Sequence, residues 1–224
     1  MTLSNAWSRY AAALTALLLI GCAESYNGPL ADKPIKTETD ERGQTRVVTL
    51  FNHLTENGVP AVPLDQAMQF FDAHKDQIDN QDWLSINDFS VHSGHPRMFV
   101  INLKTGEVDR LFVAHGIGSD PGRTGVARTF SDDPNSLMTS LGFYLVNESY
   151  QGKWGLSARL DGLQDSNSNA RERAVVLHGA TYVDGSWPTM GWTEGCPAVE
   201  MKWIETLVYR LRGRSLLYHY VEGL

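Results

Sequence analysis

Basic residues are scarce in this 224-residue sequence: 19 Lys and Arg stand against 26 Asp and Glu, which gives a formal net charge of −7 at pH 7. The sequence contains no run of basic residues and no alternation of basic with aromatic residues. Nucleic-acid binding depends on a basic surface that neutralises phosphates. The composition therefore excludes nucleic acid as a partner.

The N-terminus lacks a hydrophobic run long enough for a transmembrane helix. Its apolar stretch AAALTALLLIG, residues 11–21, is too short to span a bilayer but has the length of the apolar part of a signal peptide, and Arg9 precedes it. We expect residues 1–21 to be a signal peptide that is removed. The stretch ends in LIGC, residues 19–22, which resembles the lipobox of bacterial lipoproteins. An ordinary signal peptide with cleavage nearby is the alternative.

The lipobox resemblance implies that Cys22 is acylated and becomes the first residue of the mature protein. Ala23 follows it, where lipoproteins of the inner membrane usually carry Asp. The expected localisation is therefore the periplasmic face of the outer membrane, with the membrane a partner only through the lipid anchor.

Cysteine is rare as well, since Cys22 and Cys196 are the only two in the sequence. If Cys22 is acylated, Cys196 has no partner in the chain for a disulfide, although cysteines in exported proteins usually pair. We therefore expect the Cys196 thiol to have a function.

The chain divides by composition into three parts after the signal peptide. Residues 22–46 are polar and interrupted by two prolines, which predicts a lipid-anchored tether. Residues 47–82 form an accessory helical segment, with one helix expected over residues 63–78, where apolar residues recur at helical spacing. Residues 83–224 form the main domain.

The main domain is expected to be mostly β. Period-two alternation predicts a three-strand meander over residues 83–116. Further strands are expected over residues 141–150, 174–180 and 214–221. One helix is expected to begin at Pro197 or Ala198 and to end at Gly213, packed on the sheet just after Cys196.

Cys196 lies between Gly195 and Pro197, at the expected start of this helix, and His178 ends a strand 18 positions earlier. A helix N-terminus and a nearby base both favour a thiolate, so the pair is typical of nucleophilic catalysis. Backbone N–H groups from Glu194 to Cys196 can point at one spot and hold an oxyanion. The alternatives are a small buried cysteine and a structural histidine.

A zinc site made of Cys196, His178 and His115 is a further alternative. Zinc sites usually draw on cysteine pairs or closely spaced histidines, and the sequence has neither near these residues. We therefore expect no metal and no cofactor.

The segments HGA, residues 178–180, and TEGC, residues 193–196, resemble the signature of the L,D-transpeptidase catalytic domain family, of the YkuD type. The similarity includes RMFVINLKTGEV, residues 97–108, and SLGFYLVNESYQGKWGLSARLDGL, residues 140–163, and covers about residues 85–222. It implies an L,D-transpeptidase-like β-sandwich with a helix after the catalytic cysteine and an N-terminal accessory helix.

The resemblance implies that Cys196 is the nucleophile, that His178 is the base, and that the Gly179 carbonyl orients the imidazole. The N–H groups of Gly195, Cys196 and Glu194 would form the oxyanion hole. Cys196 would form a thioester with a peptidoglycan stem peptide, release D-alanine, and pass the acyl group to a diamino-acid amine. A family of this kind is also a carbapenem target.

Candidate substrate-binding residues are Arg159, Arg171, Arg173, His115, Thr193 and Tyr144. Stem peptides carry carboxylates, which Arg can hold with two hydrogen bonds. The resemblance implies an Arg just after the cysteine that binds the substrate carboxylate, but this chain has Pro197 and Ala198 there. Cations elsewhere in the chain are therefore needed to bind the carboxylate. The alternatives are arginines paired with neighbouring acids, a histidine that caps a strand, and a tyrosine that packs inside.

Three functions remain open at the level of sequence. An amine acceptor makes the protein an L,D-transpeptidase, whereas water makes it an L,D-carboxypeptidase or an endopeptidase that uses the same acyl-enzyme. A non-catalytic cell-wall-binding lipoprotein is the alternative from another class.

Overall fold

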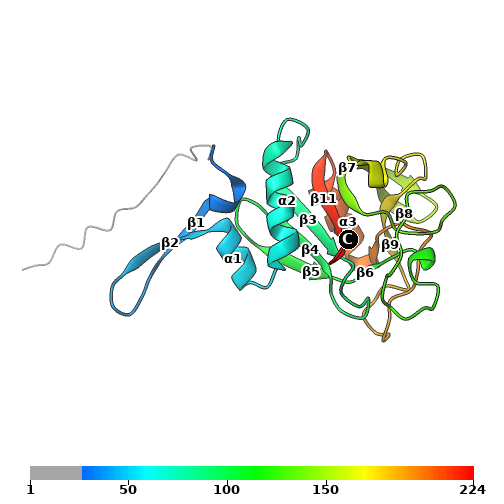
Figure 1. The fold of residues 1–224 in the computed structure, drawn as a ribbon, viewed down its shortest axis with the longest axis horizontal. Coiled ribbons are helices and arrows are strands. Elements are labelled where there is room, and N and C mark those ends of the chain that lie inside the picture. The colour runs from blue at the N-terminus through cyan, green and yellow to red at the C-terminus, as the bar shows by residue number, and fades with distance from the viewer. Residues whose placement is uncertain (1–26) are drawn as a thin grey trace, which may run out of the picture.

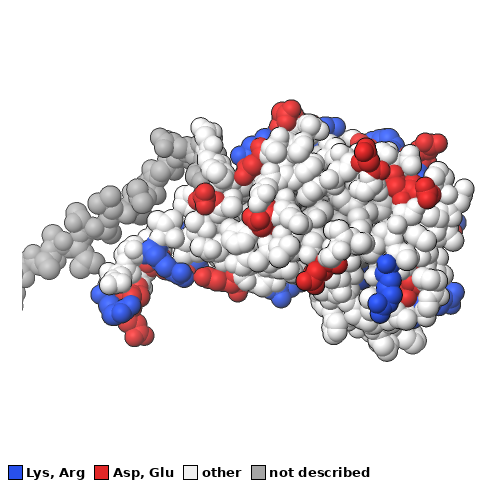
Figure 2. Space-filling model, viewed as in Figure 1, with Lys and Arg blue, Asp and Glu red and all other residues white. Residues whose placement is uncertain are grey.

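The structure, a computed structural model, describes residues 27–224 (Figure 1). The expected signal peptide, residues 1–21, and the acylation site Cys22 lie outside the described residues. No helix in the described part is long and apolar enough to cross a membrane. On the face shown in Figure 2, basic and acidic side chains are interspersed without a continuous basic area.

The segment expected to be an irregular tether contains a hairpin. Strand β1 (Pro34–Thr39) pairs antiparallel with β2 (Thr45–Thr49), and Figure 1 shows the hairpin projecting from the body of the protein. The Asp40 carboxylate accepts the N–H groups of Arg42 and Gln44 at 2.9 and 2.8 Å, and this closes the turn. The β-branched residues on both sides of the turn favour strands. The polar composition of the segment did not indicate these strands.

Two helices follow the hairpin where one was expected. Helix α1 (Leu50–Glu56) begins at Thr49, whose side chain accepts the Asn52 N–H, and α2 (Ala61–Ala73) follows it. A short 3-10 turn, η1 (Leu30–Asp32), packs beside them. The apolar faces of these helices share one buried core with the main sheet.

The main sheet has nine strands in the order β5-β4-β3-β11-β7-β8-β9-β10-β6. Their bounds are β3 (Trp83–Asp88), β4 (Met98–Asn102), β5 (Val108–Leu111), β6 (Val113–Ala114), β7 (Gly142–Gly152), β8 (Gly155–Gly162), β9 (Val176–Ala180), β10 (Ala198–Glu200) and β11 (Ser215–Tyr220). The pairs β3–β11 and β9–β10 are parallel, and the other pairs are antiparallel. Strands β5 and β6 are consecutive in the chain but lie at opposite ends of the sheet, so the sheet must coil strongly.

Both faces of the sheet are buried. Successive residues such as Leu216 and Leu217 belong to different cores, because neighbouring side chains on a strand point to opposite faces. The N-terminal helices cover one face, and α3 (Met201–Leu211) covers the other through Ile204, Leu207 and Leu211. Short 3-10 turns, η2 (Ile117–Ser119) and η3 (Asp165–Asn167), lie in the long loops.

Candidate active site

Cys196 and His178 reach one cavity from neighbouring strands. In the parallel pair of β9 and β10, His178 lies opposite Ala198, two residues after the cysteine. Both side chains line a cavity of about 860 Å³, together with Trp154, Tyr182 and others. The topology of the sheet thus brings together two residues that are 18 positions apart.

The His178 imidazole is 3% exposed, and its Nδ1 lies 3.1 Å from the Gly179 carbonyl oxygen. A carbonyl only accepts hydrogen bonds, so Nδ1 carries the proton and Nε2 is left as a proton acceptor. Burial lowers the pKa of His178, and the Gly179 carbonyl acts in the opposite direction. The ring stacks on Trp154 with centroids 5.8 Å apart. The histidine is therefore neutral at pH 7 and held in the tautomer that a base requires.

The turn that carries Cys196 is fixed by Thr193 and Gly195. The Thr193 hydroxyl accepts the Gly195 N–H at 3.0 Å and donates to the Cys196 carbonyl at 2.7 Å. Gly195 has φ 125°, and a Cβ there would lie 2.7 Å from the Met138 carbonyl oxygen. Only glycine fits this conformation. Thr193 lines the cavity, but its hydroxyl bonds within the turn, so its side chain holds the loop that carries Cys196.

The half-buried Cys196 thiol is free of disulfides, and its Sγ donates to the Ala174 carbonyl at 3.8 Å. Burial raises the pKa of this thiol, and a hydrogen bond from the Val176 N–H and the charge of Arg173 act against that rise. In the described structure the thiol contacts Ala174 and makes no hydrogen bond to His178. The resting cysteine is therefore a thiol that needs a base to ionise.

The expectation that a helix N-terminus lowers the pKa of Cys196 is wrong. Residues Ala198–Glu200 form β10, and the helix begins only at Met201. Strand pairing with β9 and β6 on both sides supplies more hydrogen bonds to these residues than a first helical turn would.

The expected oxyanion hole is smaller than predicted. The Gly195 N–H already bonds to Thr193 and is not available. The N–H groups of Cys196 and Glu194 make no hydrogen bond to any of residues 27–224. These two amides are therefore the donors of the expected set that remain free to stabilise an oxyanion.

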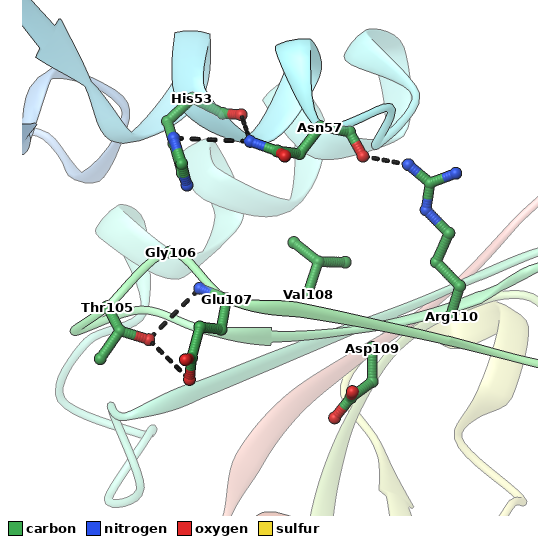
Figure 3. Close-up of a pocket in the computed structure, with 8 residues that line it drawn as sticks. All are labelled: His53, Asn57, Thr105, Gly106, Glu107, Val108, Asp109 and Arg110. Atoms are coloured by element: carbon green, nitrogen blue, oxygen red, sulfur yellow. Dashed lines mark hydrogen bonds between the residues drawn. The ribbon is translucent and has the colours of Figure 1, made fainter.

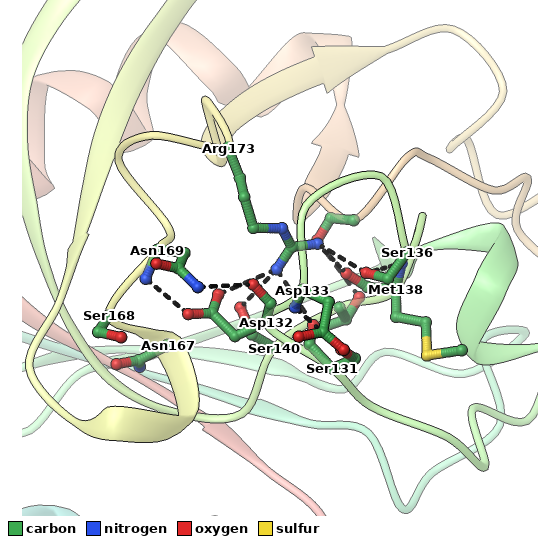
Figure 4. A network of polar contacts seen from close by, with 12 residues as sticks. Ser131, Asp132, Asp133, Ser136, Met138, Ser140, Asn167, Ser168, Asn169 and Arg173 are labelled. Atoms are coloured by element: carbon green, nitrogen blue, oxygen red, sulfur yellow. Dashed lines mark hydrogen bonds and ion pairs between the residues drawn. The ribbon is translucent and has the colours of Figure 1, made fainter.

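Arg173 lines the cavity, but its guanidinium is the centre of a network of polar contacts with neighbouring loop residues (Figure 4). Its side chain is 5% exposed and pairs with Asp132 at 3.0 Å. Its two terminal nitrogens also donate to Ser131, Ser136, Met138 and Ser140. The predicted substrate contact is therefore replaced by a supporting role, since Nη2 lies 3.2 Å from the position of a Cβ on Gly195.

The other two arginines are held outside the cavity by acids. Arg171 donates to both carboxylate oxygens of Glu148 at 3.0 Å and also pairs with Asp161. Arg159 pairs with Glu148 at 3.2 Å and stacks on Tyr150. Neither lines the cavity, so the structure supports the alternative of paired surface arginines.

His115 and Tyr144 are buried and do not contact the cavity, so the expected substrate contacts are wrong. His115 is 0% exposed, accepts a hydrogen bond from Arg97 at 2.7 Å, and lies 3.6 Å from Asp120. Burial and Arg97 lower the pKa of His115 to about 4. Tyr144 packs in the core beneath the sheet, and its hydroxyl donates to the Ser140 carbonyl at 2.8 Å. Burial raises the pKa of Tyr144.

Several cavity residues could not be singled out from the sequence, among them Lys153, Tyr182 and Trp192. Lys153 and Trp154 lie between β7 and β8, in a turn bounded by Gly152 and Gly155. The sequence signal that could have indicated this part of the cavity is the aromatic residue Trp154 in a short turn between two glycines. Among residues 27–224 no group of three His, Cys, Asp or Glu side chains is placed to hold a metal ion.

A second hollow, of about 640 Å³, lies between α1 and the β4–β5 hairpin (Figure 3). Its polar groups are mostly paired with one another. Thr105 donates to Glu107 at 3.3 Å, Arg110 donates to the Asn57 carbonyl, and the Asn57 amide donates to the His53 carbonyl at 2.7 Å. The hollow contains neither of the residues singled out for catalysis.

A sequence model of the L,D-transpeptidase catalytic domain matches residues 55–220. Similar solved structures include an L,D-transpeptidase in complex with imipenem (12% identity, TM-score 0.39, 62% of this chain and 59% of that chain covered). A second is an L,D-transpeptidase from Xylanimonas cellulosilytica, with 13% identity, a TM-score of 0.38, and 63% of this chain and 62% of that chain covered. A third is L,D-transpeptidase 3 from Mycobacterium tuberculosis, with 10% identity, a TM-score of 0.40, and 62% of this chain and 61% of that chain covered. The alignment spans less than two thirds of each of these structures. No curated protein matches the sequence.

Proposed function

Because the chain belongs to the L,D-transpeptidase catalytic domain family, we propose that it is a cysteine acyltransferase that acts on peptidoglycan stem peptides. The observation that carries the proposal is the cavity shared by Cys196 and His178, with Nε2 of the imidazole left as the proton acceptor. A thiol and a neutral imidazole at one cavity are the components of covalent acyl transfer.

In the first half of the reaction, Cys196 attacks the amide carbonyl between the diamino acid and the terminal D-alanine. The thiol leaves the Ala174 carbonyl by side-chain rotation and passes its proton to Nε2 of His178. The sulfur bonds to the carbonyl carbon, and the Cys196 N–H stabilises the oxyanion. His178 then donates the proton to the D-alanine nitrogen as the C–N bond breaks, which leaves a thioester.

In the second half, an acceptor amine attacks the thioester carbon. His178 takes a proton from the incoming amine, and the sulfur leaves as a thiolate that is reprotonated. The Val176 N–H and the Arg173 charge, which both lower the pKa of Cys196, stabilise this leaving group.

The charges of the cavity favour an amine over water as the acceptor. Glu172 and Glu194 are exposed at the cavity, and neither pairs with a cation in the described part of the chain. Two carboxylates beside the nucleophile raise the local concentration of a cationic acceptor. This supports transpeptidation over the L,D-carboxypeptidase and endopeptidase alternatives.

The test is to incubate residues 23–224 with tetrapeptide muropeptides and to analyse the products by mass spectrometry. We expect release of D-alanine and formation of crosslinked dimers, and neither with the Cys196→Ala variant. Tripeptides without dimers would identify a carboxypeptidase. No release of D-alanine by protein whose thiol still reacts with iodoacetamide would contradict the enzyme and favour the non-catalytic cell-wall-binding protein.

A carbapenem gives an independent test of the nucleophile. The strained lactam carbonyl is an acyl donor, so we expect a covalent adduct on Cys196 in intact-mass measurements. The Cys196→Ala variant should form none.

We further propose that Cys22 anchors the protein to the periplasmic face of the outer membrane. The support is the lipobox resemblance of residues 19–22 and the Ala that follows. Palmitate labelling of the full chain should be lost in the Cys22→Ala variant, and fractionation should then release the protein from the membrane.

A further inference from the structure

Four charged side chains line the catalytic cavity: Lys153, Glu172, Arg173 and Glu194. Arg173 has a side chain that is 5% exposed, and both of its terminal nitrogens donate to loop residues such as Asp132 and Met138. Within residues 27–224 the Lys153 ammonium lies 4.8 Å from the centroid of the Trp154 ring, and no carboxylate pairs with it. Lys153 is therefore the exposed cation among the described residues that line this cavity, and its ammonium donors are open to a ligand.

Lys153 is connected to the catalytic base through a stack of groups. Its ammonium packs on the Trp154 indole, and the indole in turn stacks on the His178 imidazole at 5.8 Å and an interplanar angle of 25°. A cation–π contact orients the ammonium without using its N–H donors. The ammonium is thus held against the same indole that contacts the His178 imidazole.

We propose that Lys153 binds the C-terminal carboxylate of the acyl donor, on the D-alanine that leaves. This rests on the proposed function, because it takes its geometry from the reaction. His178 protonates the leaving nitrogen, so this nitrogen must lie beside the imidazole. The carboxylate is one carbon away from the nitrogen, so it enters the same cavity that Lys153 and Trp154 line beside His178.

Apart from Arg173, the arginines near the cavity do not line it, and one of them, Arg123, stacks on Trp192 at 5.6 Å. Arg159 and Arg171 are paired with Glu148 outside the cavity. The remaining charges that line the cavity, Glu172 and Glu194, would repel a carboxylate. We therefore expect Lys153 to make the protein prefer stem peptides that end in a free carboxylate.

The experiment compares two peptides in a background that cannot turn them over. Calorimetry measures the Kd of the Cys196→Ala protein for a tetrapeptide that ends in D-alanine and for the same peptide ending in D-alaninamide. We expect the free acid to bind about tenfold more tightly, the size of one charge-assisted hydrogen bond in a partly exposed site. Adding Lys153→Met should abolish the preference, and adding Lys153→Arg should keep it.

Matched controls separate the charge from its position. Lys104→Met removes a lysine that pairs with Asp82, outside the cavity, and should leave the preference unchanged. Glu172→Gln removes a cavity charge of the other sign and should also keep the acid preferred.

The outcomes distinguish the two levels of the proposal. Equal binding of acid and amide by the Cys196→Ala protein, or an unchanged preference after Lys153→Met, would overturn the role of Lys153 while the enzyme stands. If the Cys196→Ala protein binds neither peptide, the proposed substrate itself is wrong and the role of Lys153 falls with it.

Discussion

Replacement of Arg173 by methionine tests how the catalytic turn is supported. The Arg173 side chain is 5% exposed, and its partner Asp132 is 9% exposed. Methionine keeps the bulk but leaves the Asp132 carboxylate buried without its cation. Removing one partner of a buried ion pair costs about 3–5 kcal/mol. We expect the free energy of unfolding to fall by about that amount, and the melting temperature by about 10 °C.

The same substitution should also change the chemistry of the nucleophile. The Arg173 charge lowers the pKa of Cys196, which burial holds above its ordinary value. Without that charge the pKa of the thiol should rise further. The pH dependence of alkylation by iodoacetamide should therefore shift toward higher pH in the Arg173→Met variant.

Urea denaturation and the alkylation profile measure the two effects, and Arg171→Met is the matched control. Arg171 is two residues away and pairs with Glu148 and Asp161 at the surface, where its side chain is 47% exposed. Exposed pairs contribute about 0–1 kcal/mol. The double variant Arg173→Met with Asp132→Asn removes both buried charges and should regain part of the stability. Equal losses for the two Arg→Met variants, or an unmoved alkylation profile, would refute the reasoning.

Three further predictions concern the turn and the buried histidines. Gly195→Ala puts a Cβ 2.7 Å from the Met138 carbonyl at φ 125° and should lower kcat by about 100-fold or more in the D-alanine release assay; near-normal kcat would show that the turn adapts. Thr193→Val leaves the Gly195 N–H unpaired and should cost about 1–3 kcal/mol in urea titrations, whereas Thr193→Ser should cost less. His115 and His219 have pKa values lowered to about 4 by burial, while unfolded imidazoles titrate near 6.5, so the unfolded chain binds more protons between these values. The free energy of unfolding should therefore fall as the pH falls from 6.5 to 4, and a flat profile would contradict the burial of both rings.

Most strands of the main domain could be predicted because their alternation is local, but β8 (Gly155–Gly162) was not among those predicted. The sequence did not reveal where the helix after Cys196 begins, because Ala198–Glu200 continue its apolar pattern but are drawn into a strand by pairing on both sides. Helix α1 was missed because seven residues are too few for a periodic signal, and packing of Leu50 and Leu54 stabilises it.

The nucleophile and the base could be proposed from sequence, since the residues around each form a short motif. The arginines could not be assigned, because their partners are distant in the chain. Asp132 lies 41 positions before Arg173, and Glu148 lies 23 positions before Arg171. Which carboxylate pairs with each arginine depends on how the loops pack in the folded protein, and no local sequence pattern indicates it. The hydrogen bond between Arg97 and the buried His115 could not be predicted for the same reason.

The core shared by the N-terminal helices and the sheet decides where the protein can be shortened. A truncated protein beginning at Trp83, the domain boundary expected from the sequence, would lack the helices that cover Leu84, Ile86 and Ile101. It would therefore expose a broad apolar surface to water. Such a fragment should precipitate or recruit other chains, even though every residue of the reaction centre is intact. Limited proteolysis that removes only the β1–β2 hairpin should be harmless by comparison.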